Sequence, residues 1–165
     1  MKFSIANLSD GINDCALTAE PNDLGLAENF AAKVKVRLTV DKSNRELYLR
    51  ARVATEARFH CDRCLEEFTQ KLENSYRMFY VYSEDESPKH ERDEVTVIAP
   101  ETSSIDISED VRQYLLLAVP PKLLCREGCR GLCGYCGVNL NHGRCTCPKE
   151  GADPRWETLR RLQKN

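Results

Sequence analysis

Nine cysteines in a chain of 165 residues constrain the fold of this protein more than any other feature. Six of them fall within residues 125–147 with the spacing C-x3-C-x3-C-x2-C-x8-C-x-C, and Cys61 and Cys64 form a separate C-x2-C pair. An odd number of cysteines cannot all form intramolecular disulfides, and clustered cysteines in a chain without an export signal more often bind metal or perform redox chemistry. We therefore expect the cysteines to hold metal.

Zinc is the metal that this spacing favours. A C-x2-C turn places two thiolates on one cation at about 2.3 Å each, and the stretch from Cys133 to Gly137 has the form of such a knuckle. The eight clustered cysteines could make two four-cysteine sites, or one site plus spare thiols, and the pairing is not readable from the sequence. Four thiolates leave no position for water, so the expected zinc, one or two ions, is structural. The candidate ligands are Cys61, Cys64, Cys125, Cys129, Cys133, Cys136, Cys145 and Cys147.

Other chemistry has weaker support. A thioredoxin-like C-x2-C begins a helix after a parallel strand, whereas Cys61 and Cys64 lie among expected antiparallel strands. Iron–sulfur clusters are commonly held by a C-x2-C-x2-C run, which this sequence lacks. His142 could ligate metal, but we expect its side chain to be exposed to solvent. Cys15 stands alone in the sequence, and we expect it to act as a small, buried or half-buried apolar side chain. No Ser-His-Asp order, glycine-rich phosphate loop or paired carboxylate motif stands out, so we predict that the protein is not an enzyme.

Alternation of apolar and polar residues predicts β-structure in the first part of the chain. The expected strands are 31–40, 47–53, 68–82 and 95–98, with a short first strand at 2–6. Helical spacing follows over 106–120, and Pro154 begins a short final helix. The predicted fold is of α+β class: a mainly antiparallel sheet or partial barrel over 1–100, then one central helix and a zinc-stapled C-terminal segment over 101–165.

The first two predicted long strands place basic side chains on one face. If Val40 pairs with Arg45, then Lys35 lies opposite Arg50. Like charges directly across a sheet are unfavourable, and either the side chains splay into water or an anionic partner relieves the repulsion. Basic residues around an aromatic one suit RNA better than a metabolite. The candidate RNA-binding residues are Lys33, Lys35, Arg37, Tyr48, Arg50 and Arg52.

Charge is segregated along the chain although the net charge is only −2. The stretches 33–63 and 122–165 are basic, whereas 84–110 is acidic and overlaps the predicted mobile acidic loop 83–94. A phosphate backbone would respond to such blocks. No apolar run reaches the roughly 18–20 residues of a membrane span, and no signal-peptide core is visible. We therefore expect a cytoplasmic protein that has no membrane contact and no small-molecule substrate.

Four stretches make the chain resemble the YceD family, the large ribosomal RNA subunit accumulation proteins. The resemblance covers roughly residues 25–165, and the run Gly-Leu-Cys-x2-Cys-Gly-x-Asn-Leu-Asn is its most specific part. The matching stretches are Cys61-Asp62-Arg63-Cys64-Leu65, the helix from Asp106 to Pro120, Cys129-Arg130-Gly131-Leu132-Cys133 running on to Asn141, and Asp153-Pro154-Arg155-Trp156 with Leu159.

The resemblance implies a bacterial or organellar accessory factor that supports synthesis, processing or stability of large-subunit (23S) ribosomal RNA during ribosome biogenesis. It implies no catalytic residues. The expected partners are ribosomal RNA or a pre-ribosomal particle, together with a large-subunit ribosomal protein. Two alternatives stay open: a zinc-binding protein–protein adaptor without RNA contact, and a cysteine-based oxidoreductase.

Overall fold

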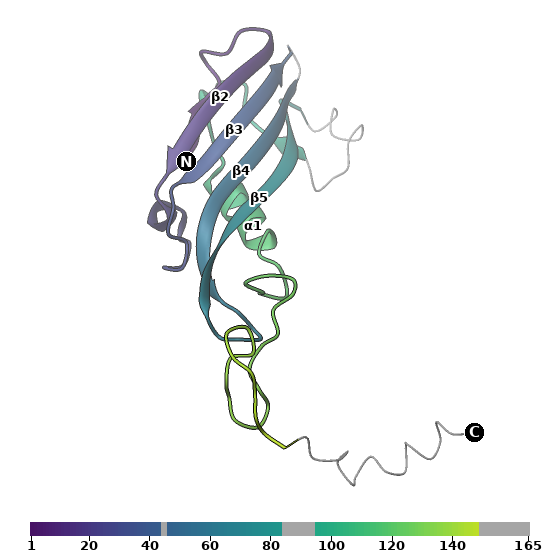
Figure 1. Ribbon diagram of the computed structural model, residues 1–165. Helices are drawn as coiled ribbons and strands as arrows, with labels where there is room; N and C mark the ends of the chain where they lie inside the picture. The colour runs from purple at the N-terminus through teal and green to yellow at the C-terminus, as the bar shows by residue number, and fades with distance from the viewer. Residues whose placement is uncertain (44–45, 84–94, 149–165) are drawn as a thin grey trace, which may run out of the picture.

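A five-stranded sheet is the main element of the fold (Figure 1). The computed structural model describes residues 1–43, 46–83 and 95–148. The sheet has the strand order β2-β3-β4-β5-β6; β2 to β5 are antiparallel, whereas β6 runs parallel to β5. The strands are β2 (Gly11–Ala19), β3 (Val34–Lys42), β4 (Glu46–His60), β5 (Glu67–Val81) and β6 (Val95–Val97).

One face of this sheet carries the core. The alternating residues of β3 illustrate the pattern, since Val34, Leu38 and Val40 have no exposed surface while Lys35 and Arg37 between them are exposed. The helix α1 (Ser108–Leu117) packs against β4 and β5 on the buried face. Figure 1 shows α1 behind the long strands. The opposite face is therefore open over most of its length.

Smaller elements complete the core. A two-stranded antiparallel sheet joins β1 (Lys2–Ser4) to β7 (Ser104–Asp106), and the 3-10 helix η1 (Pro21–Leu24) buries Leu24. Because β7 leads directly into α1, the pairing of β1 with β7 holds the N-terminal strand close to the start of a helix that lies about 100 residues later in the chain. Among the described residues, no helix has the length and apolar character needed to cross a membrane.

The predicted α+β architecture, with a mostly antiparallel sheet and one helix between 106 and 120, is confirmed. Within the described part of the chain the sheet does not close into a barrel, because it ends at β2 and β6. Strand β2 was missed by the sequence analysis, and so was β7. The final helix expected from Pro154 and the acidic loop beyond Ser83 lie outside the described residues, and the division at residue 100 stays a prediction.

The predicted pairing of β3 with β4 is wrong by four residues. Val40 lies opposite Leu49 and not Arg45, and the hairpin closes where the backbone N–H of Ser43 donates to the carbonyl of Glu46 at 2.9 Å. Asp41 and Lys42, which lie beyond the predicted strand 31–40, continue the strand. Since four is an even number, every side chain keeps its predicted face, and only its cross-strand neighbour changes.

Candidate metal centres and basic face

The connection between β4 and β5 forms a knuckle around Cys61 and Cys64. The backbone N–H of Leu65 donates to the carbonyl of Cys61 at 2.9 Å, and the N–H of Cys61 donates to the carbonyl of Glu66 at 2.9 Å. This tight turn places Leu65 in the left-handed region with φ of 62°. The two thiols therefore lie on the same side of a closed turn.

The chain repeats this knuckle at Cys133 and Cys136. The N–H of Gly137 donates to the carbonyl of Cys133 at 2.9 Å, and the N–H of Cys133 donates to the carbonyl of Val138 at 2.8 Å. Here the left-handed position, with φ of 73°, is occupied by glycine. The same two hydrogen bonds and the same backbone turn thus recur at both C-x2-C pairs, although the sequences between the cysteines differ.

The first knuckle meets two cysteines from the segment after α1, and we call this group the first cluster. Its four Sγ atoms all lie within 4.8 Å of one another. Two Sγ pairs, Cys61 with Cys129 and Cys64 with Cys125, are 3.7 Å apart. A tetrahedron with metal–sulfur distances of about 2.3 Å has sulfur–sulfur edges of about 3.8 Å. The first cluster therefore has the size of a four-thiolate metal site, and three of its cysteines are buried.

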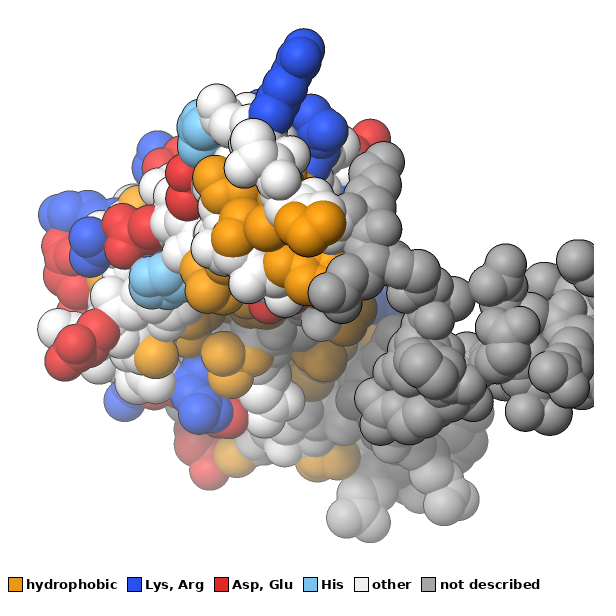
Figure 2. Space-filling model, turned by 60° about the horizontal axis from the view of Figure 1, so that its bottom comes forward, with side chains coloured by type: hydrophobic (Ala, Val, Ile, Leu, Met, Phe, Trp, Pro, Cys, Tyr) orange, Lys and Arg blue, Asp and Glu red, His pale blue; other side chains and the backbone are white. Residues whose placement is uncertain are grey.

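The second knuckle meets Cys145 and Cys147, and we call this group the second cluster. All four Sγ atoms again lie within 4.8 Å of one another. The Sγ of Cys145 is 3.2 Å from that of Cys133 and 3.7 Å from that of Cys136. This cluster is less buried than the first, and hydrophobic side chains gather at its end of the molecule (Figure 2). Both groups could hold a metal ion, and Cys15 belongs to neither.

Hydrogen bonds attach the segment after α1 to the first knuckle. The guanidinium of Arg63 donates to the carbonyl of Cys129 at 2.8 Å. The N–H of Asp62 donates to the carbonyl of Leu123 at 2.8 Å, and the N–H of Leu123 donates back to the Asp62 carboxylate at 2.7 Å. Gly131 runs so close that a Cβ there would lie 3.0 Å from the Arg63 carbonyl. The first knuckle thus contacts this segment through its backbone as well as through its thiols.

Two further contacts join the clusters to each other. The Asn141 side-chain amide donates to Sγ of Cys129 at 3.3 Å, and its carbonyl accepts from the N–H of Arg130 at 2.9 Å. His142 lies 2.8 Å from the carboxylate of Glu66, and this hydrogen bond lowers the pKa of Glu66. As expected, His142 is exposed. Asn141 was not predicted as a site residue, although it lies in the most specific part of the family resemblance.

Ionisation of the thiols is uneven within each cluster. Burial opposes ionisation of Cys61, but hydrogen bonds to backbone groups outweigh it and lower the pKa of this thiol to about 6. Backbone groups of Cys136 and Tyr135 lower the pKa of Cys133 to about 6, while hydrogen bonds to Cys145 and Cys136 raise the pKa of Cys147 to about 12. Four crowded thiols cannot all lose their protons without a cation between them. Each cluster is therefore suited to a divalent metal that ionises all four.

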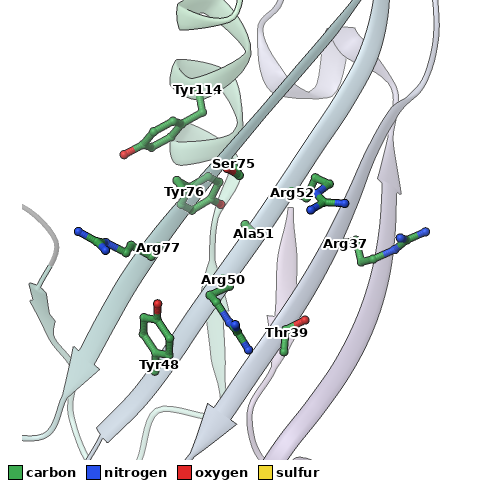
Figure 3. Close-up of a pocket in the computed structure, with 10 residues that line it drawn as sticks. All are labelled: Arg37, Thr39, Tyr48, Arg50, Ala51, Arg52, Ser75, Tyr76, Arg77 and Tyr114. Carbon is green, nitrogen blue, oxygen red and sulfur yellow. The ribbon is translucent and has the colours of Figure 1, made fainter.

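The open face of the sheet carries a second candidate site. A group of exposed cations near the middle of this face forms what we call the basic face, and Figure 3 shows that its four arginines come from β3, β4 and β5. Arg37 lies directly opposite Arg52, and Arg50 lies directly opposite Arg77. The basic face consists of Lys35, Arg37, Arg50, Arg52 and Arg77.

The cross-strand partners on this face differ from those predicted. The expected opposition of Lys35 to Arg50 is wrong, because Lys35 faces Ala54. Lys33 precedes the strand and forms an ion pair with Glu20 at 2.8 Å, so its charge already has an anionic partner. Within the described parts of the chain, Arg37, Arg50 and Arg52 make no ion pair.

Arg77 was missed by the sequence analysis. The alternation of 68–82 that predicted β5 places Arg77 among the outward odd positions, so the strand pattern already held the signal. Tyr48, the predicted aromatic member, lies on the basic face and stacks on Phe79 with ring centroids 4.7 Å apart. The guanidinium carbon of Arg50 is 5.7 Å from the centroid of the Tyr48 ring.

Comparison with known proteins places these features in a family. The model of the family described as "Large ribosomal RNA subunit accumulation protein YceD" matches residues 49–163, a range that holds both cysteine clusters and most of β4. A relative from Arabidopsis thaliana, the chloroplastic "Large ribosomal RNA subunit accumulation protein YCED homolog 1", is 36% identical over 64 residues. An uncharacterized protein of Mycobacterium tuberculosis is 27% identical over 139 residues.

The extent of these matches differs. The Arabidopsis alignment covers 39% of this chain and 20% of the relative, whereas the mycobacterial one covers 81% of this chain and 64% of the relative. The chain thus spans less than two thirds of the length of either protein. No solved structure shows a significant match. Because the family model covers well over half of the chain, the chain belongs to the YceD family of large ribosomal RNA subunit accumulation proteins.

Proposed function

We propose that this protein is a non-catalytic accessory factor that supports synthesis, processing or stability of 23S ribosomal RNA, and that it contacts the RNA through its basic face. Family membership supports the role in accumulation of large-subunit RNA. The observation that carries the RNA contact is the direct opposition of Arg37 to Arg52, with neither in an ion pair among the described residues. The expected partner is a pre-ribosomal particle in the cytoplasm.

Electrostatics favours an anionic partner for this face. Two like charges directly opposite each other on a sheet destabilise it by a few tenths to about 1 kcal/mol. Arg50 lies two residues from Arg52 on the same strand, so its charge adds to the repulsion. Arginine binds phosphate oxygens in a bidentate manner, and the phosphates of a nucleic acid would neutralise several of these charges at once.

We further propose that both cysteine clusters hold structural zinc. The Sγ separations of 3.7 Å in the first cluster support a tetrahedral four-thiolate site. Zinc bound by four thiolates has no open position for a substrate, so its role is to fix the fold. The segment 122–148 contributes few buried side chains apart from Cys129, and bound metal would supply much of the energy that orders it.

The adaptor and oxidoreductase alternatives make different predictions. An adaptor would associate with large-subunit particles through protein contacts alone, and the arginines of the basic face would be dispensable. An oxidoreductase would need two free thiols in a cycle of disulfide formation, whereas both knuckles place each thiol within a group of four. Thiol titration with and without a chelator separates this alternative, since metal-bound thiolates react only after the metal is removed.

The proposed role is tested by sedimentation of a cell extract, followed with an antibody to this protein. We expect the protein in fractions that contain large-subunit precursors, and the double variant R37Q/R52Q should leave those fractions at moderate salt. The matched control is R58Q, which removes an exposed arginine of the same strand that lies opposite Thr69. Wild-type protein that stays at the top of the gradient would contradict the role. Equal association of both variants would favour the adaptor.

Metal analysis of the freshly reduced protein tests the zinc proposal. We expect two equivalents of zinc per chain, one for each cluster. A zinc content well below one equivalent would refute the proposal.

A further inference from the structure

The arginines of the basic face are arranged as two cross-strand pairs. The pair Arg37–Arg52 bridges β3 and β4, and the pair Arg50–Arg77 bridges β4 and β5. Because Arg50 and Arg52 are two residues apart on β4, the pairs are offset by about 7 Å along the strand. Long side chains spread from these positions can hold neighbouring phosphates of one nucleic-acid strand.

An aromatic cross-strand pair lies next to the two arginine pairs. Tyr48 lies directly opposite Phe79, next to the Arg50–Arg77 pair on the same face. The two rings are stacked with an interplanar angle of 24°, and both are half-buried. A hollow of about 590 Å³ lies above the sheet here, and its lining includes Tyr48 and all four arginines (Figure 3). Phosphate-binding groups and a stacking surface therefore share one concave surface.

The positive area is short. Asp41 lies opposite Tyr48 at one end of the face, and Glu73 lies opposite Ala54 towards the other, so acidic side chains flank the arginines in both directions along the strands. Proteins that bind double-stranded RNA by shape span about 16 base pairs and contact phosphates across two grooves. A basic area that consists of two arginine pairs and Lys35 instead fits a few nucleotides.

We propose that the basic face binds a short single-stranded segment of RNA, with phosphates held by the pairs Arg37–Arg52 and Arg50–Arg77 and a base stacked on the aromatic pair Tyr48–Phe79. This inference rests on the proposed function and deepens it by naming the strand class and by adding Arg77 and Phe79 to the site. Bases are available for stacking on aromatic rings in a single strand, whereas in a duplex they are stacked on each other.

The test compares binding of the full chain, reduced and loaded with zinc, to a short oligouridine and to a duplex RNA of matched length. Fluorescence anisotropy over a range of salt concentrations gives the dissociation constants and the salt slopes. We expect at least about tenfold tighter binding of the single strand. The variant Y48A should weaken that binding by about 5- to 150-fold, since stacking of one base contributes roughly 1–3 kcal/mol.

Further variants separate the contributions and guard against a folding defect. R77Q should reduce the magnitude of the salt slope by about 0.7, the value for one phosphate contact on a single strand, and R58Q should change nothing. Y48F, which keeps the ring, should bind as the wild type does.

Two outcomes would overturn the inference. Duplex bound as tightly as the single strand, with Y48A unaffected, would refute it while the proposed RNA contact stands. Binding of neither RNA would refute both, and sedimentation with pre-ribosomal particles would then decide whether the accessory role acts through protein.

Discussion

Asn141 contacts Cys129 across the boundary between the two cysteine clusters, with its side-chain amide 3.3 Å from Sγ. The donor belongs to the loop between the knuckle Cys133–Cys136 and the returning Cys145, and the acceptor is a buried ligand candidate of the first cluster. An N–H group aimed at a thiolate stabilises its negative charge. Formation of the second cluster therefore positions a group that supports the first.

The variant N141A should weaken metal binding at the first cluster. Loss of a hydrogen bond to a metal ligand typically lowers metal affinity by about 10–100-fold. Competition with a chromogenic chelator would show one metal released at a lower chelator concentration and one released as in the wild type. The control is H142Q, which alters an exposed neighbour of Asn141 whose hydrogen bond goes to Glu66 and not to a thiol. Identical release curves for N141A and wild type would contradict the coupling.

Loss of each cluster should loosen a different part of the chain. The variant C133S removes a ligand of the second cluster, whose cysteines all lie within 133–147, so faster hydrogen exchange should be confined to about that stretch. The variant C61S also separates the connection of β4 and β5 from the segment after α1, so exchange should rise from 122 onward and at the adjoining ends of both strands. The core of β3 should stay protected in both variants. Unchanged exchange of 122–148 in C61S would refute the proposed role of the first cluster.

The two knuckles offer a matched pair of substitutions at equivalent positions. Leu65 adopts a left-handed conformation and is 62% exposed, so L65G removes backbone strain at little cost in burial. The strain of about 1–2 kcal/mol exceeds the roughly 0.4–1 kcal/mol by which glycine favours the unfolded chain, and the net gain should reach about 1 kcal/mol. The reciprocal variant G137A should destabilise, although no atom lies within 4 Å of its added Cβ.

Denaturant unfolding of metal-loaded protein measures both changes in stability. A loss of stability in L65G would contradict the prediction, because it would mean that the exposed Leu65 side chain stabilises the fold by more than its backbone strain costs.

Because Arg37 and Arg52 lie directly opposite each other, a substitution that stabilises the sheet should weaken RNA binding. The variant R52E places a carboxylate opposite Arg37, so repulsion is replaced by attraction and the free energy of unfolding should rise by about 0.2–1 kcal/mol. The same change should weaken RNA binding, because one phosphate contact is lost and a negative charge is added. Unfolding curves and anisotropy on the same preparation check both effects. R58E, opposite Thr69, should leave stability within experimental error. A destabilised R52E would contradict the electrostatic argument.

The alternation of apolar residues was enough to predict the long strands and their buried faces but not their exact neighbours. A slip of four residues between β3 and β4 preserves the inward positions of Val36 and Leu38, so period-2 patterning cannot detect it. The pairing is decided at the turn, where Ser43 bonds to Glu46. Charged residues such as Asp41 favour a loop in isolation, and the neighbouring strand β2 overrides that preference by pairing Ile12 with Asp41.

Strand β2 could not be predicted from the alternation of apolar and polar residues. It lies at the edge of the sheet, its inward residues are only half-buried, and Ile12 points outward with 68% of its surface exposed. Its sequence therefore lacks the contrast between faces that identifies β3. The division of eight cysteines into two groups was equally hidden, because Cys125 and Cys129 join the distant Cys61 and Cys64 and not the neighbouring knuckle at Cys133. Only the folded position of the β4–β5 connection determines that choice.

The first cluster also has a consequence for the unfolded chain. Its ligand candidates come from Cys61 and Cys64 on one side and from Cys125 and Cys129 on the other, so a metal held by all four closes a loop that contains β5, β6, β7 and α1. A cross-link around some sixty residues removes conformational entropy from the denatured ensemble equivalent to about 4 kcal/mol, by the model used for disulfides. A metal that remains on these thiols during unfolding would thus favour refolding. Its removal would leave the unfolded chain with more conformations to lose when it folds.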